Sequence, residues 1–212
     1  MENEATRTRY RAAKALLQQP KRILISGHLS PDGDSLGSMI ALARMLRAAG
    51  HDAVATADPH ALGKPGFLEG VADLVPPRKL KRRRFDLFIY VDAAAPSRLP
   101  PEVRPFAEKL PTLTIDHHAT SQETGAVSII DPTASSAGEL VWRFAKWMEW
   151  PFDRAIAEAL WVAIVTDSGR FAYDSTKPST LRAAGDLLKY GVRTALINDI
   201  LYCSFNTKAI EL

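Results

Sequence analysis

The sequence has few of the features that would assign it at once to a secreted or membrane-spanning class. It contains one cysteine, Cys203, among 212 residues, which excludes an intrachain disulfide framework and is typical of a reducing compartment. No run of about 18 apolar residues is present, and residues 1–4 are polar and acidic. We therefore expect a soluble, cytoplasmic protein with no contact to a membrane, in which Cys203 is a small buried residue on the last helix.

An excess of charge of one sign is also missing. The chain has 27 lysines and arginines against 24 aspartates and glutamates, so its formal net charge is only +3. This balance alone does not indicate a nucleic-acid-binding protein. Six basic residues nevertheless crowd positions 78–84, just before an apolar segment. We interpret this basic run as a solvated loop, and the alternative is that it steers an anionic, phosphate-bearing substrate.

Apolar residues make up 46% of the chain, enough to bury a substantial core. Short apolar runs predict strands at 23–25, 54–56, 85–91, 112–115 and 126–130. Helices are predicted over 4–19, from Asp34 or Ser35 to Gly50, from Ser136 past Phe144, and over 153–165, 178–189 and 194–201. This alternation indicates an α/β fold in a single domain over residues 1–212, with a mostly parallel sheet flanked by helices.

Four polar segments with acidic residues lie where apolar segments stop. They are His28 to Ser38 with Asp32 and Asp34, then Asp92, then Asp116-His117-His118, then Thr166 to Gly169 with Asp167. Three of these segments follow predicted strands, and ligands bind at the carboxyl ends of the strands in open α/β sheets. The remaining histidines, His51 and His60, have no acidic neighbours at ligand spacing, and we predict that both are on the surface.

The residue types in these segments predict a metal centre. Carboxylates as close in sequence as Asp32 and Asp34 repel each other unless a cation joins them, whereas a structural loop needs only one acid as a helix cap. Imidazole and carboxylate without thiolate suit Mn²⁺ best, with Mg²⁺, Fe²⁺, Co²⁺ or Zn²⁺ as alternatives. Asp32, Asp34, Asp92 and Asp167 together carry four negative charges, which two divalent ions would cancel. Such a pair can hold a bridging hydroxide and clamp a phosphate ester.

The motifs, taken in order, resemble the DHH family of phosphoesterases, named for the triplet that is here Asp116-His117-His118. The resemblance runs from about Arg22 to Phe205. It includes His28-x-x-x-Asp32-x-Asp34 with Gly37-Ser38, Val91-Asp92 with Ser97-Arg98-Leu99, the triplet, Ser135-Ser136, and Thr166 to Phe171. Within the family, the sequence looks most like the nanoRNase/pAp-phosphatase branch. That branch degrades very short RNAs and dephosphorylates 3′-phosphoadenosine 5′-phosphate.

The resemblance implies a role for each residue. One metal ion would be bound by His28, Asp32 and Asp92, and the other by Asp34, Asp92, His117 and Asp167, so that Asp92 bridges the two ions. His118 would contact the scissile phosphate and protonate the leaving oxygen. Asp116 would orient one of the metal ligands without binding an ion itself. Arg98 and Ser136 would support the site or contact the substrate.

Two departures from the family pattern leave alternatives open. Residues 93–95 after Asp92 are alanines, where the family usually has polar residues. Family members also carry a second, carboxy-terminal substrate-binding domain, and residues 203–212 correspond only to the start of the linker that leads to it. The main hypothesis is a phosphoesterase acting on short RNA or a nucleotide, with a homodimer as one predicted assembly. The alternatives are hydrolysis of a cyclic or linear dinucleotide, and a catalytically weak nucleotide-binding module.

Overall fold

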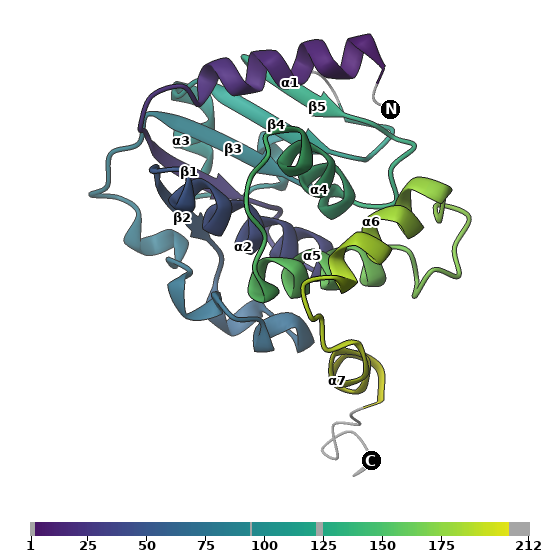
Figure 1. Ribbon diagram of the computed structural model, residues 1–212. Helices are drawn as coiled ribbons and strands as arrows, with labels where there is room; N and C mark the ends of the chain where they lie inside the picture. The colour runs from purple at the N-terminus through teal and green to yellow at the C-terminus, as the bar shows by residue number, and fades with distance from the viewer. Residues whose placement is uncertain (1–2, 94, 122–124, 204–212) are drawn as a thin grey trace.

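A computed structural model describes residues 3–93, 95–121 and 125–203 of the chain. Within these residues a single parallel sheet of five strands has the order β2-β1-β3-β4-β5 (Figure 1). The strands are β1 (Arg22–Ser26), β2 (Asp52–Thr56), β3 (Leu87–Val91), β4 (Thr112–Asp116) and β5 (Val127–Ile130). The predicted α/β fold is confirmed, and every strand pair is parallel where the sequence predicted only a mostly parallel sheet.

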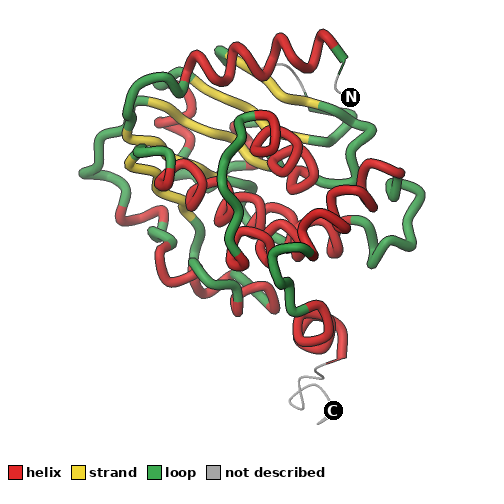
Figure 2. Tube along the Cα trace, viewed as in Figure 1, coloured by secondary structure: helices red, strands yellow, loops and turns green. Residues whose placement is uncertain are grey.

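Helices cover the sheet on both faces (Figure 2). The α-helices are α1 (Glu4–Leu16), α2 (Gly33–Ala48), α3 (Arg104–Lys109), α4 (Ala137–Trp147), α5 (Arg154–Asp167), α6 (Pro178–Leu188) and α7 (Thr194–Asn198), and a π-helix follows over Asp199–Cys203. Short 3₁₀ turns occupy much of the connection from β2 to β3. Among the described residues, no helix combines the length and the apolar character needed to cross a bilayer.

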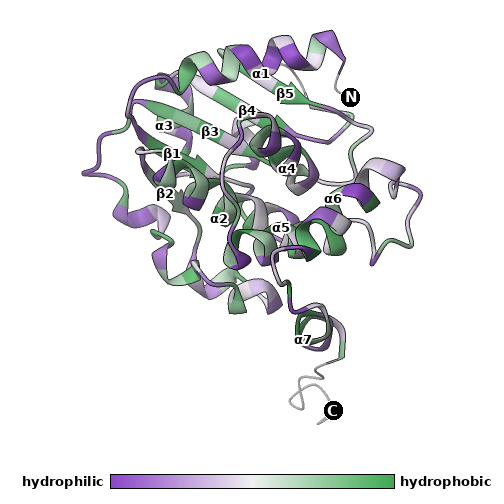
Figure 3. Cartoon of the chain, in the orientation of Figure 1, coloured by the Kyte–Doolittle hydropathy of each residue, from purple (hydrophilic) through white to green (hydrophobic). Residues whose placement is uncertain are grey.

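The strands are mostly apolar at their inner positions, because both faces of the sheet are covered (Figure 3). On one face, Ile23 and Ile25 belong to the large core formed with α1, α2, α4 and α5. On the other face, Leu24 and Phe88 belong to a smaller core that includes Val103 and Ala107 at α3. The helix α2 is buried along nearly its whole length because α5 and α4 pack against its outer side.

Close packing of α2 on α5 depends on one glycine. A Cβ atom at Gly37 would lie 2.2 Å from the carbonyl oxygen of Ala159, so the helices could not approach as they do with any other residue there. Asp32 caps the start of α2, and Asp167 is the last residue of α5. The contact between the two helices therefore helps to set the distance between these two acidic residues.

Several local predictions were wrong in instructive ways. The cap of α2 is Asp32, whose side chain accepts a hydrogen bond from the Ser35 amide, and not Asp34 or Ser35. Cys203 is exposed, because the last helical segment ends in a π-helix at the surface. His60 is exposed as predicted, but His51 is buried at the start of β2.

Candidate metal centre

The strand order places the site. In this order, the chain leaving β1 runs to its neighbour β2, whereas the chain leaving β3 runs in the opposite direction across the sheet to β4. The crevice between the carboxyl ends of β1 and β3 is therefore the topological switch point. The loop after β1 carries His28 and Asp32, and Asp92 follows β3 directly. The next strand, β4, ends at Asp116 and delivers His117. All of these groups therefore reach one edge of the sheet.

A first group of ligand atoms comes from the loops after β1 and β3. Nε2 of His28 lies 3.3 Å from Oδ2 of Asp92 and 3.7 Å from Oδ2 of Asp32. The three side chains present ligand atoms that all lie within 4.8 Å of one another, which is close enough to surround one ion.

A second group comes from three other elements. Nε2 of His117 lies 3.3 Å from Oδ2 of Asp167 at the end of α5 and 3.6 Å from Oδ2 of Asp34 in the first turn of α2. It also lies 3.6 Å from Oδ1 of Asp92, whose other oxygen faces His28. Asp92 therefore lies between the two groups and can be shared by two ions. Its backbone adopts φ of 57°, a left-handed conformation that few residues other than glycine occupy.

Asp34 is held by a helix that the sequence did not connect with it. Its buried carboxylate accepts hydrogen bonds from the Ala137 amide at 2.7 Å and the Gly138 amide at 2.8 Å, both in the first turn of α4. Amides in the first turn of a helix have no partner within the helix and favour a negative charge. The hydroxyl of Ser38 adds a third bond at 3.2 Å. Asp34 is thus fixed with one oxygen toward His117.

The pKa values show that the site is short of positive charge when no cation is bound. Burial and the charge of Asp92 raise the pKa of Asp34 well above its usual value. Hydrogen bonds to Asp32 and Asp92 raise the pKa of His28 to about 9. Burial alone would lower the pKa of His117, but Asp92, Asp34 and Asp167 raise it to about 9. Protons are therefore retained where divalent ions could replace them.

A separate chain of hydrogen bonds fixes the second histidine of the triplet. Oδ1 of Asp116 lies 2.7 Å from Nδ1 of His118, and Oδ2 accepts a hydrogen bond from the Ser121 hydroxyl. Burial would raise the pKa of Asp116, but its bonds to His118 and Ser121 lower it to about 2. An ionised carboxylate can only accept, so Nδ1 of His118 carries the proton and Nε2 is left for the site.

The structure brings together six predicted ligands: His28, Asp32, Asp34, Asp92, His117 and Asp167. His118 and Asp116 lie beside them. Arg98 is exposed, and its carbonyl oxygen accepts a hydrogen bond from the Leu29 amide, so its segment borders the His28 loop. Ser136 is fully buried, and its hydroxyl caps α4 by accepting from the Glu139 amide. The basic run at 78–84 ends beside Asp86, which pairs with Arg22 at the opposite edge of the sheet.

Sequence reasoning missed the residues that support the ligands. Ser121 has no motif of its own, because it acts through a turn and not through a helical or strand spacing. Glu139 is fully buried and accepts from the Ser135 amide and hydroxyl and from Thr180 at the start of α6. Its position three residues after Ser136 follows the helix-start pattern Ser-x-x-Glu, and this signal could have identified it.

Comparison with known proteins decides the family. The model of the DHH family, N-terminal domain, matches residues 22–164. The chain belongs to the DHH family. Its matched region includes both groups of ligand atoms except Asp167, which lies three residues beyond it.

Proteins with similar sequences are longer than this chain. It is 32% identical over 184 residues to the bifunctional oligoribonuclease and PAP phosphatase NrnA of Thermus thermophilus, covering 84% of this chain and 53% of the relative. The protein of the same name from Bacillus subtilis is 28% identical over 185 residues, covering 85% of this chain and 56% of the relative. The chain thus spans about half the length of these relatives.

Two further similarities bear on function and fold. The cyclic-di-AMP phosphodiesterase GdpP of Bacillus subtilis is 27% identical over 206 residues, covering 90% of this chain and 31% of the relative. An exopolyphosphatase-related protein from Bacteroides fragilis has a similar structure, with a TM-score of 0.85 at 22% identity, covering 94% of this chain and 61% of that chain. The structural likeness shows that the fold is shared.

Proposed function

We propose that this chain is the catalytic part of a metal-dependent phosphoesterase that hydrolyses short oligoribonucleotides and 3′-phosphoadenosine 5′-phosphate. The placement of Asp92 between the two groups of ligand atoms is the observation that carries the proposal. The family and the names of the NrnA relatives supply the substrate class.

The donor set fits two divalent ions. His28, Asp32 and Asp92 would hold one ion, and Asp34, Asp92, His117 and Asp167 the other. These donors are imidazole and carboxylate groups without a thiolate, which suits Mn²⁺ best among the common divalent ions. When bound, two such ions supply an activated water molecule and neutralise the charge that develops on the phosphate oxygens.

The remaining residues act on the substrate or on the ligands. Asp116 fixes Nδ1 of His118, so that Nε2 in its protonated form can donate a proton to the leaving oxygen. Arg98 would contact a substrate phosphate from the rim beside Leu29. Ser136 would support the site by capping α4, whose next two amides bind Asp34.

Cyclic-di-AMP or linear dinucleotide hydrolysis is the second candidate, because GdpP matches 90% of the chain. Both readings use the same metal chemistry and differ in the substrate. We further propose a single catalytic domain over 1–212, although residues 204–212, where the linker was predicted, lie outside the described residues. The predicted homodimer and cytoplasmic location are proposals of the same kind.

Hydrolysis assays test the proposal. Purified chain with Mn²⁺ is expected to cleave a diribonucleotide and to release phosphate from 3′-phosphoadenosine 5′-phosphate. Asp92→Ala should lower turnover by at least about 10³-fold, since both ions lose a ligand. Equal rates for the two proteins would contradict the role of Asp92. Faster hydrolysis of cyclic-di-AMP than of the diribonucleotide would favour the second candidate.

A further inference from the structure

A cationic cavity lies between α1, α4 and α6, whose places in the fold Figure 1 shows. Its volume is about 520 Å³, within the range of sites that hold small molecules. Four positively charged side chains line it: Arg7 from α1, Arg143 and Lys146 from α4, and Arg182 from α6. No aspartate or glutamate is among the described residues that line it. The cavity therefore favours an anionic ligand.

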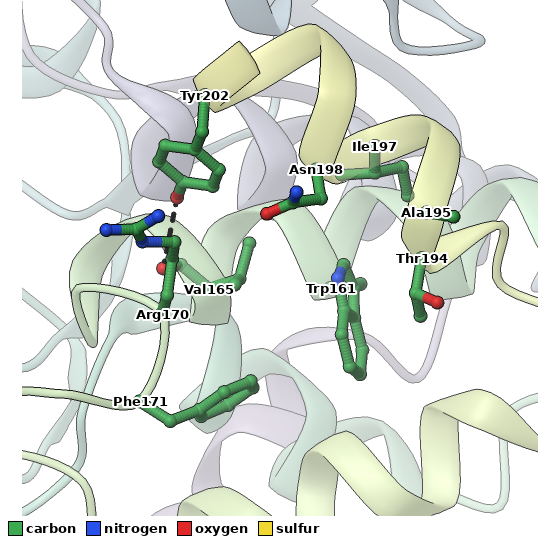
Figure 4. Close-up of a pocket in the computed structure, with 9 residues that line it drawn as sticks. All are labelled: Trp161, Val165, Arg170, Phe171, Thr194, Ala195, Ile197, Asn198 and Tyr202. Atoms are coloured by element: carbon green, nitrogen blue, oxygen red, sulfur yellow. Dashed lines mark hydrogen bonds between the residues drawn. The ribbon is translucent and has the colours of Figure 1, made fainter.

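This charge pattern is not shared by the cavity between α5 and α7 (Figure 4). The cavity in Figure 4 has mainly aromatic and aliphatic walls, and Arg170 is the only charged side chain among the described residues that line it. The guanidinium of Arg170 lies over the ring of Tyr202, 4.9 Å from its centroid. A gathering of four cations is therefore a particular property of the cavity between α1, α4 and α6.

Two of the four cations have no carboxylate partner. Arg7 and Arg182 are exposed, and neither forms an ion pair within the part of the chain that the structure describes. Lys146 is also exposed, but its Nζ lies 3.2 Å from Oδ2 of Asp186, which balances its charge. The excess positive charge of the cavity is thus that of Arg7 and Arg182, which come from separate helices.

Arg143 is fixed in place and still has donors to offer. Its guanidinium donates to Asp131 at 2.8 Å, to Glu139, and to the Ser179 hydroxyl at 3.0 Å. A guanidinium has five N–H groups, so two remain without a partner among the described residues. The hydroxyl of Ser179 also lines the cavity and accepts from Arg143, so its own hydrogen can point to a ligand. A guanidinium held in this way loses little side-chain entropy when it binds an anion.

Two indole rings give the cavity a rigid wall. Trp142 is buried, and its Nε1 donates a hydrogen bond to Asp186 at 3.1 Å. Trp147 is partly buried and packs against Tyr10, with ring centroids 5.5 Å apart. Apolar surface beside charged groups lowers the local dielectric constant, so the cations attract an anion more strongly here than on an open surface.

The cavity is distinct from the metal centre. None of the six proposed metal ligands lines it. The amide of Ala137, which binds Asp34, is in the first turn of α4, whereas Arg143 and Lys146 are six and nine residues further along the helix. A rise of 1.5 Å per residue places them about 9 and 13 Å beyond that amide along the helix axis. A ligand in the cavity therefore occupies a site of its own.

We propose that this cavity is a binding site for a diphosphate group, as in free pyrophosphate or a nucleoside diphosphate. Two unpaired guanidinium groups from separate helices match a ligand with two anionic groups, and arginine binds phosphate oxygens through paired hydrogen bonds. Arg7 and Arg182 bind the two phosphate groups, and Arg143 and Ser179 donate to their oxygens. The inference does not rest on the proposed function, because none of these residues belongs to the metal centre.

Titration calorimetry of the full chain tests the site. Metal ions are first removed on a chelating resin, because EDTA is itself a polyanion that would compete for the cavity. Pyrophosphate is expected to bind at one site per chain, with an affinity that falls as the salt concentration is raised from about 0.05 to 0.3 M. The empty metal centre is rich in carboxylates and does not attract this anion.

Two variants and a matched control locate the binding. Arg7→Gln and Arg182→Gln should each weaken the binding of pyrophosphate about 5- to 50-fold, since each loses charge-assisted hydrogen bonds to phosphate. Arg154→Gln removes the same charge from the first turn of α5, outside the cavity, and should bind pyrophosphate as wild type does. All three side chains are exposed, so the variants should keep the Tm of wild type.

A comparison of ligands identifies the source of the diphosphate. Tighter binding of ADP than of pyrophosphate assigns the site to a nucleoside diphosphate, and the reverse order assigns it to free pyrophosphate. Three results would overturn the site. The first is no saturable binding of either ligand. The second is unchanged binding in both variants, which would move the anion to another basic surface such as residues 78–84. The third is tighter binding of malonate, a dicarboxylate, than of pyrophosphate.

Hydrolysis of a diribonucleotide with Mn²⁺ separates this inference from the proposed function. Arg7→Gln should keep the wild-type rate, because Arg7 lies outside the metal centre. A lower rate in this variant would place Arg7 on the path of the substrate and overturn a separate site. A wild-type chain that binds pyrophosphate and hydrolyses no phosphodiester would refute the proposed function and support the site.

Discussion

At the scale of single residues, most of the six proposed ligands follow a rule that the sequence makes visible, and the residues that support them do not. Asp92 and His117 could be predicted because each follows an apolar strand and parallel strands end at one edge. Ser121 could not, because its bond to Asp116 depends on a turn after β4 that leaves no periodic signal. The chemistry of a site is thus easier to read from sequence than the hydrogen bonds that position it.

Ser121→Ala tests this positioning role. Loss of the hydroxyl removes the hydrogen bond from Ser121 to Oδ2 of buried Asp116, and so loosens the carboxylate that orients the imidazole of His118. We expect kcat for a diribonucleotide to fall about 5- to 20-fold with little change in KM, consistent with one lost hydrogen bond to a charged group. Ser97→Ala, at an exposed serine, is the control. A rise in KM alone would point to a substrate contact instead.

Metal binding should release protons, because two of the proposed ligands are protonated in the metal-free chain. His28 and His117 have pKa values raised to about 9 from 6.5. At pH 7.5 we expect release of about two protons per chain on saturation with Mn²⁺. Titration calorimetry in buffers of different ionisation enthalpy measures this number. Release of no protons would contradict the raised pKa values.

The same shift sets the pH dependence of the metal-free fold. A histidine whose pKa is raised on folding stabilises the folded state fully below its unfolded value of 6.5, and this stabilisation is lost as pH rises through the folded value near 9. The free energy of unfolding in EDTA is therefore expected to fall between pH 6.5 and 9, as urea denaturation would measure. Saturating Mn²⁺ should flatten this slope.

At the scale of elements, the spacing of apolar residues predicted most helices and strands. A short helix was missed, and the end of the last helix was predicted inaccurately. The six-residue helix α3 begins at Arg104-Pro105 and has too few turns to show an apolar stripe. The last helix was predicted over 194–201, but α7 ends at Asn198 and continues as a π-helix. The contact of α2 with α5 could not be predicted, because a glycine in a helix does not reveal what lies opposite it.

Glycine substitutions test that contact. Gly37→Ala would place a Cβ atom 2.2 Å from the Ala159 carbonyl oxygen, so the helices must separate. We expect a loss of about 1–3 kcal/mol in the free energy of unfolding. Gly185→Ala in α6 is the control: its Cβ would meet no atom within 4 Å, and removing a glycine from a helix should add about 0.5–1 kcal/mol. Equal effects in chemical denaturation would contradict the packing argument.

At the scale of the whole molecule, the metal centre joins elements that are far apart in the sequence. Loops after β1, β3 and β4 and the ends of α2 and α5 all contribute a group. Ions that bind only this assembled arrangement must stabilise the entire fold. At 100 times its dissociation constant a ligand adds about 2.7 kcal/mol, which for a chain of this size raises Tm by roughly 5–10 °C.

Differential scanning fluorimetry with and without Mn²⁺ measures this shift. Asp167→Asn should raise the Tm of the metal-free chain slightly, since burial and Asp92 oppose its charge, and should reduce the Mn²⁺ response. Asp86→Asn is the control, because Asp86 pairs with Arg22 at the other edge of the sheet and its variant should keep the full response. An undiminished response in Asp167→Asn would remove Asp167 from the ligand set.

The left-handed backbone of Asp92 has a consequence for the choice of variants at this position. Asparagine tolerates that conformation nearly as well as aspartate, whereas alanine is disfavoured there by about 1 kcal/mol. Asp92→Asn therefore removes only the carboxylate that we propose the two ions share, whereas Asp92→Ala also distorts the backbone at the end of β3. The difference in melting temperature between two equally inactive proteins would measure how much conformational strain the fold holds in place at its centre.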